Sequence, residues 1–393
     1  MFQEQTKRRR RGKPRPFRRQ SRRPGPKKIN VSQFISKATG IKNEEYVPVH
    51  TFADFQIEEK LKHNILQKGY IQPSPIQDKA IPEILSGKDV VGLANTGTGK
   101  TAAFLIPLIN KVMRNPRESV LIMAPTRELA FQIQKEFVTF AKNLHLHSTL
   151  CIGGASMGVQ ISQLRRGPHF VIGTPGRLKD LIQQGVLNLS KCGNVVLDEA
   201  DQMMDMGFIH DMRFILEKLP EQKQSLFFSA TMPPEIQSLV ASFLKDPVTI
   251  SVKLQDTSAN VDQDVIPVAS NDEKFEILCN LLSQPDFDKV LVFGRTKYGV
   301  EKLAKALLKR GFKAESIHGN KTQNKRQKAV DLFKAHHVQV LVATDVMSRG
   351  MDIPNVSHVI NYDLPQSYED YVHRIGRTGR AAQTGVALTF VEG

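Results

Sequence analysis

The sequence has 393 residues, 40% of them hydrophobic, which is enough for two or three domains of ordinary size, each with its own core. It contains no run of the roughly 18 or more apolar residues that a membrane helix requires, and its basic start excludes a secretory signal. The three cysteines form no C-x-x-C pair, which excludes a disulfide framework and a zinc site of the usual spacing. We therefore expect a soluble cytoplasmic protein that contacts no membrane.

The net charge of +16 is concentrated near the N-terminus. Residues 1–28 contain thirteen Lys or Arg against one acid, Glu4, for a net charge of +12. Like-charge repulsion, proline and few apolar groups predict a disordered basic arm, because ordering it would bury too little to offset the lost backbone entropy. Such an arm binds phosphate chains without reading their sequence, although an acidic protein surface or a nuclear import receptor would also attract it. Residues 29–50 indicate a partly ordered connector, so arm and connector together occupy residues 1–50.

Two α/β domains are expected after the connector. From Thr51 onward, short β-branched runs alternate with helical stretches, a pattern typical of parallel βαβ units. The first domain is expected over residues 51–252, with strands at Val90–Ala94, Val120–Ala124, Phe170–Gly173, Val195–Leu197 and Ser225–Phe228 and helices at Thr101–Met113 and Glu128–Lys142. Residues 253–262 lack apolar periodicity and predict a linker. The second domain is expected over residues 263–393, with strands at Val290–Phe293, Val338–Ala343 and Val386–Val391 and helices at Lys297–Arg310 and Thr322–Lys334.

A glycine-rich stretch after the first expected strand predicts a phosphate-binding loop. It comprises Ala94, Asn95, Thr96, Gly97, Thr98, Gly99, Lys100 and Thr101. The glycines let backbone N–H groups face the phosphates, Lys100 supplies a cation to the β- and γ-phosphates, and the Thr101 hydroxyl can bind Mg²⁺. The strand before the loop and the helix after it favour this interpretation over an accidental turn.

Acidic residues follow the expected strand Val195–Leu197. Asp198 and Glu199 stand at its carboxyl end, where open parallel sheets bind their ligands. We expect Asp198 to hold Mg²⁺, largely through water, and Glu199 to orient or deprotonate an attacking water. Taken alone, the pattern suits an acidic helix cap equally well. The phosphate-binding loop upstream favours the catalytic interpretation.

These acids begin the tetrad Asp-Glu-Ala-Asp, which ends at Asp201, and from Thr51 onward the chain resembles the DEAD-box RNA helicases of superfamily 2. The resemblance implies two tandem RecA-like parallel-sheet domains, with ATP and Mg²⁺ bound between them and RNA as the partner. Residues 69–77 resemble the Q motif of this family, which implies that Gln77 hydrogen-bonds to the adenine edge and that Tyr70 packs on the ring. Phe52 stands at the place of the family's isolated upstream aromatic residue, which implies a contact at the same site.

Other segments of the first domain resemble coupling and RNA-binding motifs. Ser229-Ala230-Thr231 resembles the motif that hydrogen-bonds to the acidic tetrad through Asp201 and couples hydrolysis to strand separation. The RNA contacts implied on this domain are Pro125, Thr126, Arg127, Gly154, Thr174, Pro175, Gly176 and Arg177. Hydroxyls, arginines and N–H groups at helix starts suit a sugar–phosphate chain rather than base edges, so binding is expected to be independent of sequence.

The second domain resembles the other half of the same machine. RNA contacts are implied for Gly319, Gln323, Arg326 and Thr344. Asp352 is implied to hold the ribose of ATP. His373 opens a segment in which Arg377 and Arg380 resemble arginine fingers, which reach the γ-phosphate held by the other domain.

The resemblance implies an RNA-dependent ATPase that unwinds short RNA duplexes and remodels RNA–protein complexes, with one nucleotide gripped from both domains. Two alternatives remain open. In the first alternative, the chain acts mainly as an ATP-gated RNA clamp or annealing chaperone, and the basic arm adds non-specific affinity. In the second, it is a DNA helicase or translocase. No dimerisation element is visible, which favours a monomer.

Overall fold

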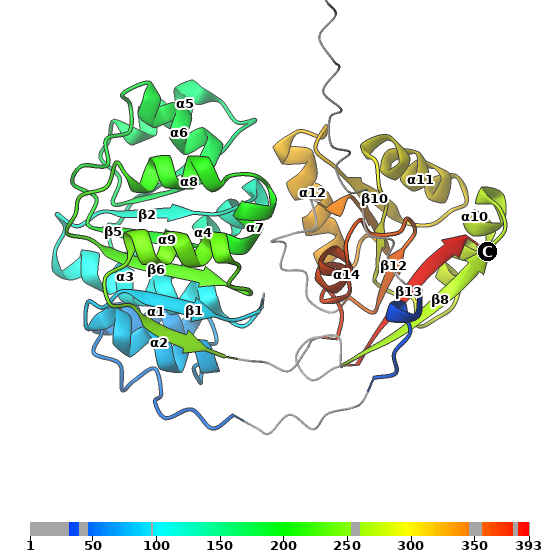
Figure 1. The fold of residues 1–393 in the computed structure, drawn as a ribbon, viewed down its shortest axis with the longest axis horizontal. Coiled ribbons are helices and arrows are strands. Elements are labelled where there is room, and N and C mark those ends of the chain that lie inside the picture. The colour runs from blue at the N-terminus through cyan, green and yellow to red at the C-terminus, as the bar shows by residue number, and fades with distance from the viewer. Residues whose placement is uncertain are drawn as a thin grey trace, which may run out of the picture.

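The computed structural model describes residues 31–38, 46–95, 97–252, 260–345, 356–379 and 384–392. The basic arm at residues 1–28 and the predicted site residues Thr96, Asp352 and Arg380 lie outside these ranges. The described chain forms two α/β lobes side by side (Figure 1). We call residues 46–252 the first lobe and residues 260–392 the second.

A seven-stranded sheet forms the centre of the first lobe. All its pairings are parallel, in the order β3-β4-β2-β5-β6-β1-β7. The strands are β1 Val90–Leu93, β2 Val120–Met123, β3 Ser148–Cys151, β4 Phe170–Gly173, β5 Asn194–Leu197, β6 Gln224–Ser229 and β7 Val248–Ser251. The β1, β2, β4, β5 and β6 strands overlap the predicted ones. The edge strands β3 and β7 were not predicted, because their half-buried residues interrupt the apolar runs.

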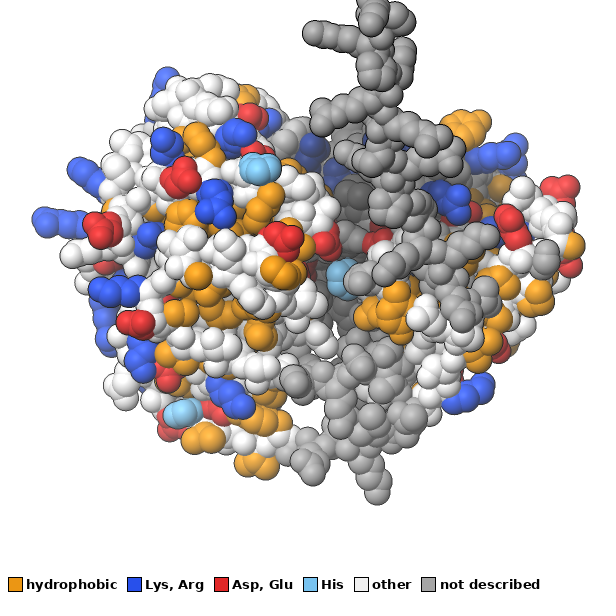
Figure 2. Space-filling model, viewed as in Figure 1, with side chains coloured by type: hydrophobic (Ala, Val, Ile, Leu, Met, Phe, Trp, Pro, Cys, Tyr) orange, Lys and Arg blue, Asp and Glu red, His pale blue; other side chains and the backbone are white. Residues whose placement is uncertain are grey.

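Helices cover both faces of this sheet. They are α1 Glu59–Gln67, α2 Pro75–Leu85, α3 Lys100–Arg114, α4 Arg127–Phe140, α5 Met157–Leu164, α6 Pro175–Gln183, α7 Ala200–Asp205, α8 Ile209–Leu216 and α9 Pro234–Phe243. One apolar core joins α1 to α4 to one face, and a second joins α6 to α9 to the other. Lys and Arg side chains are interspersed with acidic ones on the visible face of this lobe (Figure 2).

The second lobe repeats the architecture with six parallel strands. Their order is β10-β11-β9-β12-β13-β8. The strands are β8 Val261–Val268, β9 Val290–Phe293, β10 Ala314–Ile317, β11 Val340–Ala343, β12 His358–Asn361 and β13 Gly385–Glu392. The helices are α10 Asn271–Leu282, α11 Lys297–Lys309, α12 Gln323–Lys334 and α14 Tyr368–Ile375. The two parallel sheets confirm the predicted α/β fold class.

Strand β8 begins within the range that the sequence assigned to the linker. Val261 is fully buried and pairs with Gly385 of β13. The predicted end of the linker at residue 262 is therefore wrong by two residues. Alternating exposure along β8 hid the strand, since an edge strand carries polar residues on one face.

The connector before Thr51 contacts both lobes. The 3₁₀ helix η1, Val31–Phe34, packs on the second lobe with Phe34 in its core. Residues 46–50 attach to Asp78 of the first lobe. The sequence predicted a partly ordered connector but neither of these attachments. Along the described residues, no helix is both long and apolar enough to cross a membrane.

Candidate functional site

The phosphate-binding loop connects β1 to α3, as predicted. Gly99 precedes the first helical residue with φ of 94°, and a Cβ atom there would lie 2.4 Å from the Gln77 side-chain nitrogen. Only glycine fits this position. Lys100 is buried, and its ammonium donates to the Ala94 carbonyl at 2.9 Å. The loop thus holds a buried cation at the start of a helix, where backbone N–H groups attract anions.

Gln77 ties the Q motif to this loop. Its side-chain oxygen accepts from the Ser74 N–H at 2.9 Å, and its side-chain nitrogen donates to the Gly99 carbonyl at 3.1 Å. The residue is 3% exposed, whereas a helix-surface glutamine would be open to solvent. Its amide therefore helps to shape the phosphate loop.

Tyr70 and Phe52 occupy different places, although the sequence assigned both to the nucleotide. Tyr70 lines a cavity of about 180 Å³ together with Gly97, Lys100 and Thr101. Phe52 is 2% exposed and packs edge-on against Tyr70, with ring centroids 5.8 Å apart. Phe52 is not among the residues that line this cavity with Tyr70, and the nucleotide contact predicted for it stays a prediction. Phe52 supports Tyr70 from within the core, because the chain before the Q motif folds under the tyrosine ring.

Asp198 and Glu199 line the same cavity as Lys100. They follow β5, and Glu199 adopts a left-handed backbone with φ of 53°, a strained conformation of the kind that clusters at active sites. Burial raises the pKa of the Asp198 carboxyl, an effect that the neighbouring Glu199 reinforces and Lys100 opposes.

The surroundings of Asp198 fit a divalent cation. Its Oδ1 atom is buried without a hydrogen-bond partner among the described residues. A carboxylate in this state, close to a phosphate loop and the hydroxyl of Thr101, has the ligand chemistry that Mg²⁺ prefers.

The predicted contact between Asp201 and the Ser229-Ala230-Thr231 segment is present. Oδ2 of Asp201 accepts from the N–H groups of Ala230 and Thr231, at 3.1 and 2.8 Å, and from the Thr231 hydroxyl at 2.9 Å. The Asp201 N–H in turn donates to the Ser229 hydroxyl at 3.1 Å. Three bonds to one carboxylate oxygen join the end of β6 rigidly to the acidic tetrad.

A second cavity, of about 410 Å³, brings together eight of the twelve residues predicted to contact RNA. From the first lobe it is lined by Pro125, Thr126, Arg127, Thr174, Gly176 and Arg177, and from the second by Gly319 and Arg326. Thr126 caps α4 by accepting from the Leu129 N–H at 3.2 Å. Pro175 begins α6 after Thr174. Both helix starts therefore direct backbone N–H groups at this cavity.

Arginines concentrate positive charge around this cavity. Burial lowers the pKa of Arg127, and so do the nearby charges of Arg326 and Arg177, while Glu128 opposes them. Arg127 packs over Gly154, where φ is 76° and an added Cβ would lie 2.2 Å from the guanidinium. Three guanidinium groups in one cavity suit a chain of phosphates.

The lobes make direct contact beside this cavity. Glu128 accepts from Arg326 in an ion pair in which both side chains are buried, and from the Gln323 side-chain nitrogen at 3.2 Å. The sequence assigned Gln323 and Arg326 to RNA but gave Glu128 no role. No local pattern could have revealed it, because its partners lie almost two hundred residues away.

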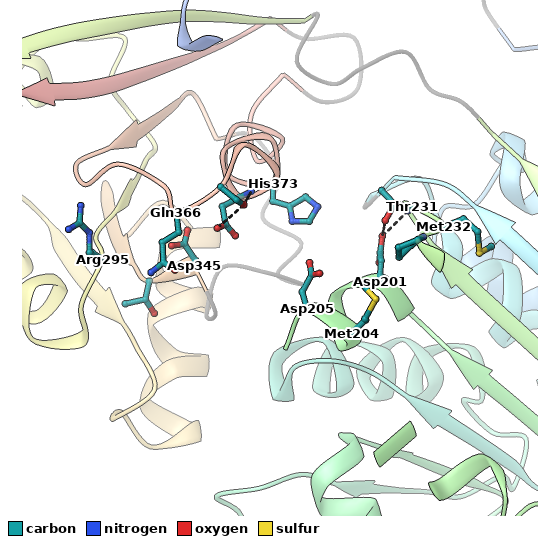
Figure 3. Close-up of a pocket in the computed structure, with 13 residues that line it drawn as sticks. Asp201, Met204, Asp205, Thr231, Met232, Arg295, Asp345, Gln366 and His373 are labelled. Carbon is teal, nitrogen blue, oxygen red and sulfur yellow. Dashed lines mark hydrogen bonds between the residues drawn. The ribbon is translucent and has the colours of Figure 1, made fainter. Parts of the chain in front are cut away.

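A third cavity, with a volume of about 810 Å³, lies between the lobes. The first lobe contributes Asp201 and Thr231, and the second contributes Arg295, Thr344 and His373. His373 extends from α14 towards the first lobe, where Asp201, Asp205 and Thr231 lie (Figure 3). Thr344, which the sequence assigned to RNA, thus lines the interlobe cavity that Asp201 also lines.

Arg374 and Arg377, in and just after α14, make different hydrogen bonds. Arg374, which the sequence left without a role, is 2% exposed and donates to Asp345, Asn361 and the Asp363 carbonyl. Arg377 is 5% exposed and donates to the His373 carbonyl at 3.4 Å. Arg374 therefore fixes the helix to the sheet.

The fold and site define a two-lobed protein with a phosphate-binding loop at one sheet and a cavity lined with arginines from both lobes. Residues 74–239 match the DEAD/DEAH box helicase family, and residues 273–382 match the helicase conserved C-terminal domain. The chain belongs to the DEAD-box family of ATP-dependent helicases.

Relatives and solved structures agree with this assignment. The ATP-dependent RNA helicase CshA of Limosilactobacillus reuteri is 45% identical over 341 residues, which cover 86% of this chain and 69% of that protein. A DEAD box protein from Methanococcus jannaschii is 41% identical with a TM-score of 0.52, covering 87% of this chain and 93% of the other. Dbp5 of S. cerevisiae bound to RNA and ADP BeF3 is 29% identical with a TM-score of 0.76, covering 87% and 90%.

The two structural comparisons differ in an informative way. At equal coverage of this chain, the more identical M. jannaschii protein superposes less well than RNA-bound Dbp5. Because sequence identity would favour the opposite order within each lobe, the relative placement of the lobes here resembles that in the Dbp5 complex.

Proposed function

We propose that this DEAD-box protein is an RNA-dependent ATPase that couples ATP binding and hydrolysis to local, sequence-independent opening of RNA duplexes and to remodelling of RNA–protein complexes. One observation carries the proposal. Arginines and helix starts of the first lobe and Gly319 and Arg326 of the second line a single cavity, in which three guanidinium groups outnumber the carboxylates of Glu128 and Asp180. A strand bound there contacts both lobes, so RNA favours the arrangement in which the lobes meet.

The first lobe binds the nucleotide. Gln77 and Tyr70 hold adenine, the loop from Ala94 to Thr101 holds the phosphates, and Lys100 supplies positive charge to them. Thr101 and Asp198 would hold Mg²⁺, largely through water, and the cation would supply further positive charge to the phosphates. Glu199 accepts a proton from the attacking water or orients it. The buried position of Lys100, Asp198 and Glu199 around one cavity supports these roles.

The second lobe completes the reaction when the lobes close. Arg377, with Arg380 and with Asp352 on the ribose, reaches the nucleotide and stabilises charge that develops on the γ-phosphoryl group. His373, at the edge of the interlobe cavity, supports this approach because it already faces Asp201 and Thr231. Arginine fingers of this kind accelerate phosphoryl transfer by about 10³ to 10⁵-fold.

ATP and RNA help each other bind because both favour the closed form. The bonds between Asp201, Ser229 and Thr231 connect the acids that act on ATP to the lobe surface, and thereby couple hydrolysis to release of the strand. A closed cavity that holds one strand does not accept a regular duplex, so a few base pairs open locally.

The substitution Glu199→Gln tests the proposal. It keeps the size of the side chain but removes the general base, so RNA-stimulated turnover is expected to fall by about 10² to 10⁴-fold. Binding of ATP and single-stranded RNA should persist as a trapped complex, measured by fluorescence anisotropy of a labelled oligonucleotide. Glu217→Gln, on the exposed end of α8, is the matched control. Undiminished turnover in Glu199→Gln contradicts the assignment.

The basic arm adds a second candidate activity, because thirteen cations in residues 1–28 bind RNA without reading it. In this alternative the chain works mainly as an ATP-gated clamp or annealing chaperone. Deletion of residues 1–28 separates the two. A helicase keeps RNA-stimulated ATPase activity with weaker and less salt-dependent RNA binding, whereas an annealer loses strand annealing. Stimulation by DNA equal to that by RNA would instead favour a DNA translocase.

A further inference from the structure

The segment before the first lobe is built into the second lobe. Phe34 is 1% exposed and lies in the core that also contains Val261 and Tyr371. Its ring centroid lies 4.5 Å from that of Tyr371. Burial of an aromatic side chain of this size stabilises the docked position of the segment.

Backbone bonds fix the register of this docking. Ser36 and Gln263 exchange two hydrogen bonds, with N···O distances of 3.0 and 2.8 Å, in an antiparallel bridge at the edge strand β8. The Ala38 N–H donates to the Asp262 carboxylate at 3.0 Å. The segment therefore covers part of a sheet edge that would otherwise expose unpaired backbone groups.

The docked residues meet the helix that leads to the arginines. Tyr371 belongs to α14 and is fully buried, and its hydroxyl donates to the Gln263 side-chain oxygen at 2.9 Å. Gln263 in turn pairs with Ser36. The docked segment thus contacts the second lobe through two connected pairs, Phe34 with Tyr371 and Ser36 with Gln263. The hydrogen bond between Tyr371 and Gln263 joins the two pairs. His373, two residues further along α14, lines the interlobe cavity.

The same chain then attaches to the nucleotide side of the first lobe. One buried carboxylate, Asp78, accepts from the Tyr46 hydroxyl at 2.6 Å, from the Val49 N–H at 2.8 Å, and from the His50 N–H at 3.1 Å. Asp78 follows Gln77 directly on α2. The segment is therefore attached beside the adenine-binding glutamine at one end and beside the arginine-bearing helix at the other.

We infer that the docked residues 31–38 and 46–50 form a positioning element of the ATPase, in which Phe34 acts through Tyr371 to hold α14 in the orientation that hydrolysis requires. The inference rests on the proposed function, since it concerns the helix that delivers Arg377. Ala38 and Tyr46 are eight residues apart in sequence, so while both ends are docked their separation cannot exceed about 28 Å. Val252 and Asn260, on either side of the linker between the lobes, are also eight residues apart. Two connections of equal reach restrict how far α14 can move from the nucleotide.

The test compares full-length Phe34→Ala with two matched variants. Phe34→Leu keeps apolar volume beside Tyr371, and Ile35→Ala removes a neighbouring side chain that is 54% exposed. RNA-saturated kcat of Phe34→Ala is expected to fall about tenfold, because small displacements of a catalytic group are costly. The Kd for ADP should stay at the wild-type value, because ADP lacks the γ-phosphoryl group that Arg377 is proposed to reach. Phe34→Leu should recover most of the kcat, and Ile35→Ala should match the wild type.

Hydrogen exchange of the nucleotide-free chains supplies a readout independent of turnover. Phe34→Ala is expected to accelerate amide exchange along α14 but not along α2 or α3. Tyr371→Phe, which keeps the ring and removes the hydroxyl that bonds to Gln263 and Thr389, should lower kcat about threefold and serves if Phe34→Ala does not fold. Equal kcat in Phe34→Ala and Ile35→Ala, unchanged kcat in Tyr371→Phe, or a parallel loss of ADP affinity each overturns the inference. A wild type without RNA-stimulated hydrolysis instead refutes the proposed function, whatever α14 does.

Discussion

The two lobes have the same architecture, but the residues that follow their strands differ in chemistry. In the first lobe, β1 leads into a glycine loop with Lys100, and β5 leads into Asp198 and Glu199. In the second lobe, β9 leads into Gly294 and Arg295, whose N–H donates to the Asp363 carboxylate at 2.7 Å. A parallel sheet thus supplies positions, and the residues just beyond its strands decide whether a lobe binds phosphate or assists from outside.

The lobes also differ in how their charged groups are held. Lys100 and Asp198 face one small cavity of the first lobe and balance each other. In the second lobe Arg374 is tied to Asp345, Asn361 and Asp363, and its neighbours on α14 reach towards the interlobe cavity. One lobe is a preformed binding site, and the other is a support that presents groups to its partner. Unequal effects of mutations in the two lobes follow from this difference.

The largest expected effect comes from a residue of the supporting lobe. Arg377→Ala removes a proposed finger, so RNA-stimulated kcat should fall by about 10³-fold or more. ADP affinity should not change, because ADP lacks the γ-phosphoryl group on which Arg377 is proposed to act. Stopped-flow phosphate release and ADP titration measure the two quantities, with Arg310→Ala on the exposed end of α11 as control. A kcat within threefold of wild type would show that the first lobe completes hydrolysis unaided.

A smaller effect is expected where the lobes touch. Arg326→Ala leaves Glu128 buried with one partner fewer, and therefore weakens the closed arrangement. The ATP-dependent affinity for single-stranded RNA should fall about 10 to 100-fold, in the range of ordinary coupling energies. Filter binding with and without an ATP analogue measures it, and Lys325→Ala on the exposed face of α12 controls for lost charge. An equal loss of RNA affinity in both variants would show that Arg326 acts only through its charge on the phosphates.

The smallest effect concerns acid stability and should appear in the second lobe. Hydrogen bonds from Ser316 and His318 lower the pKa of Glu301 from 4.5 to about 2. Because the folded pKa lies below the unfolded one, Glu301 stabilises this lobe fully above about pH 4.5, and the stabilisation is lost as the pH falls towards 2.

Glu301→Gln should therefore flatten the dependence of unfolding free energy on pH within this window. Urea titrations between pH 2 and pH 5 measure the slope, with exposed Glu221→Gln of the first lobe as control. Identical slopes for wild type and Glu301→Gln would exclude the carboxylate as a source of acid sensitivity.

The sequence by itself determined the parts of this protein that are local. The phosphate loop, the acidic tetrad and the core strands β1, β2, β4, β5 and β6 were predicted at nearly their observed positions, because each depends on a short run of residues with its own hydrophobic pattern or turn chemistry. The Asp201 contact with Ser229 and Thr231 was implied by the resemblance to the DEAD-box family, and in the structure it joins the ends of adjacent parallel strands.

Only the tertiary structure decided which distant residues meet. It placed Phe52 beneath Tyr70 rather than in the nucleotide cavity, paired Glu128 with Arg326 across the lobes, and buried Phe34 against Tyr371. Each contact joins residues from separate elements, and its energy comes from desolvation and packing that exist only once both partners are assembled. A pattern read along the chain contains no information about that partner.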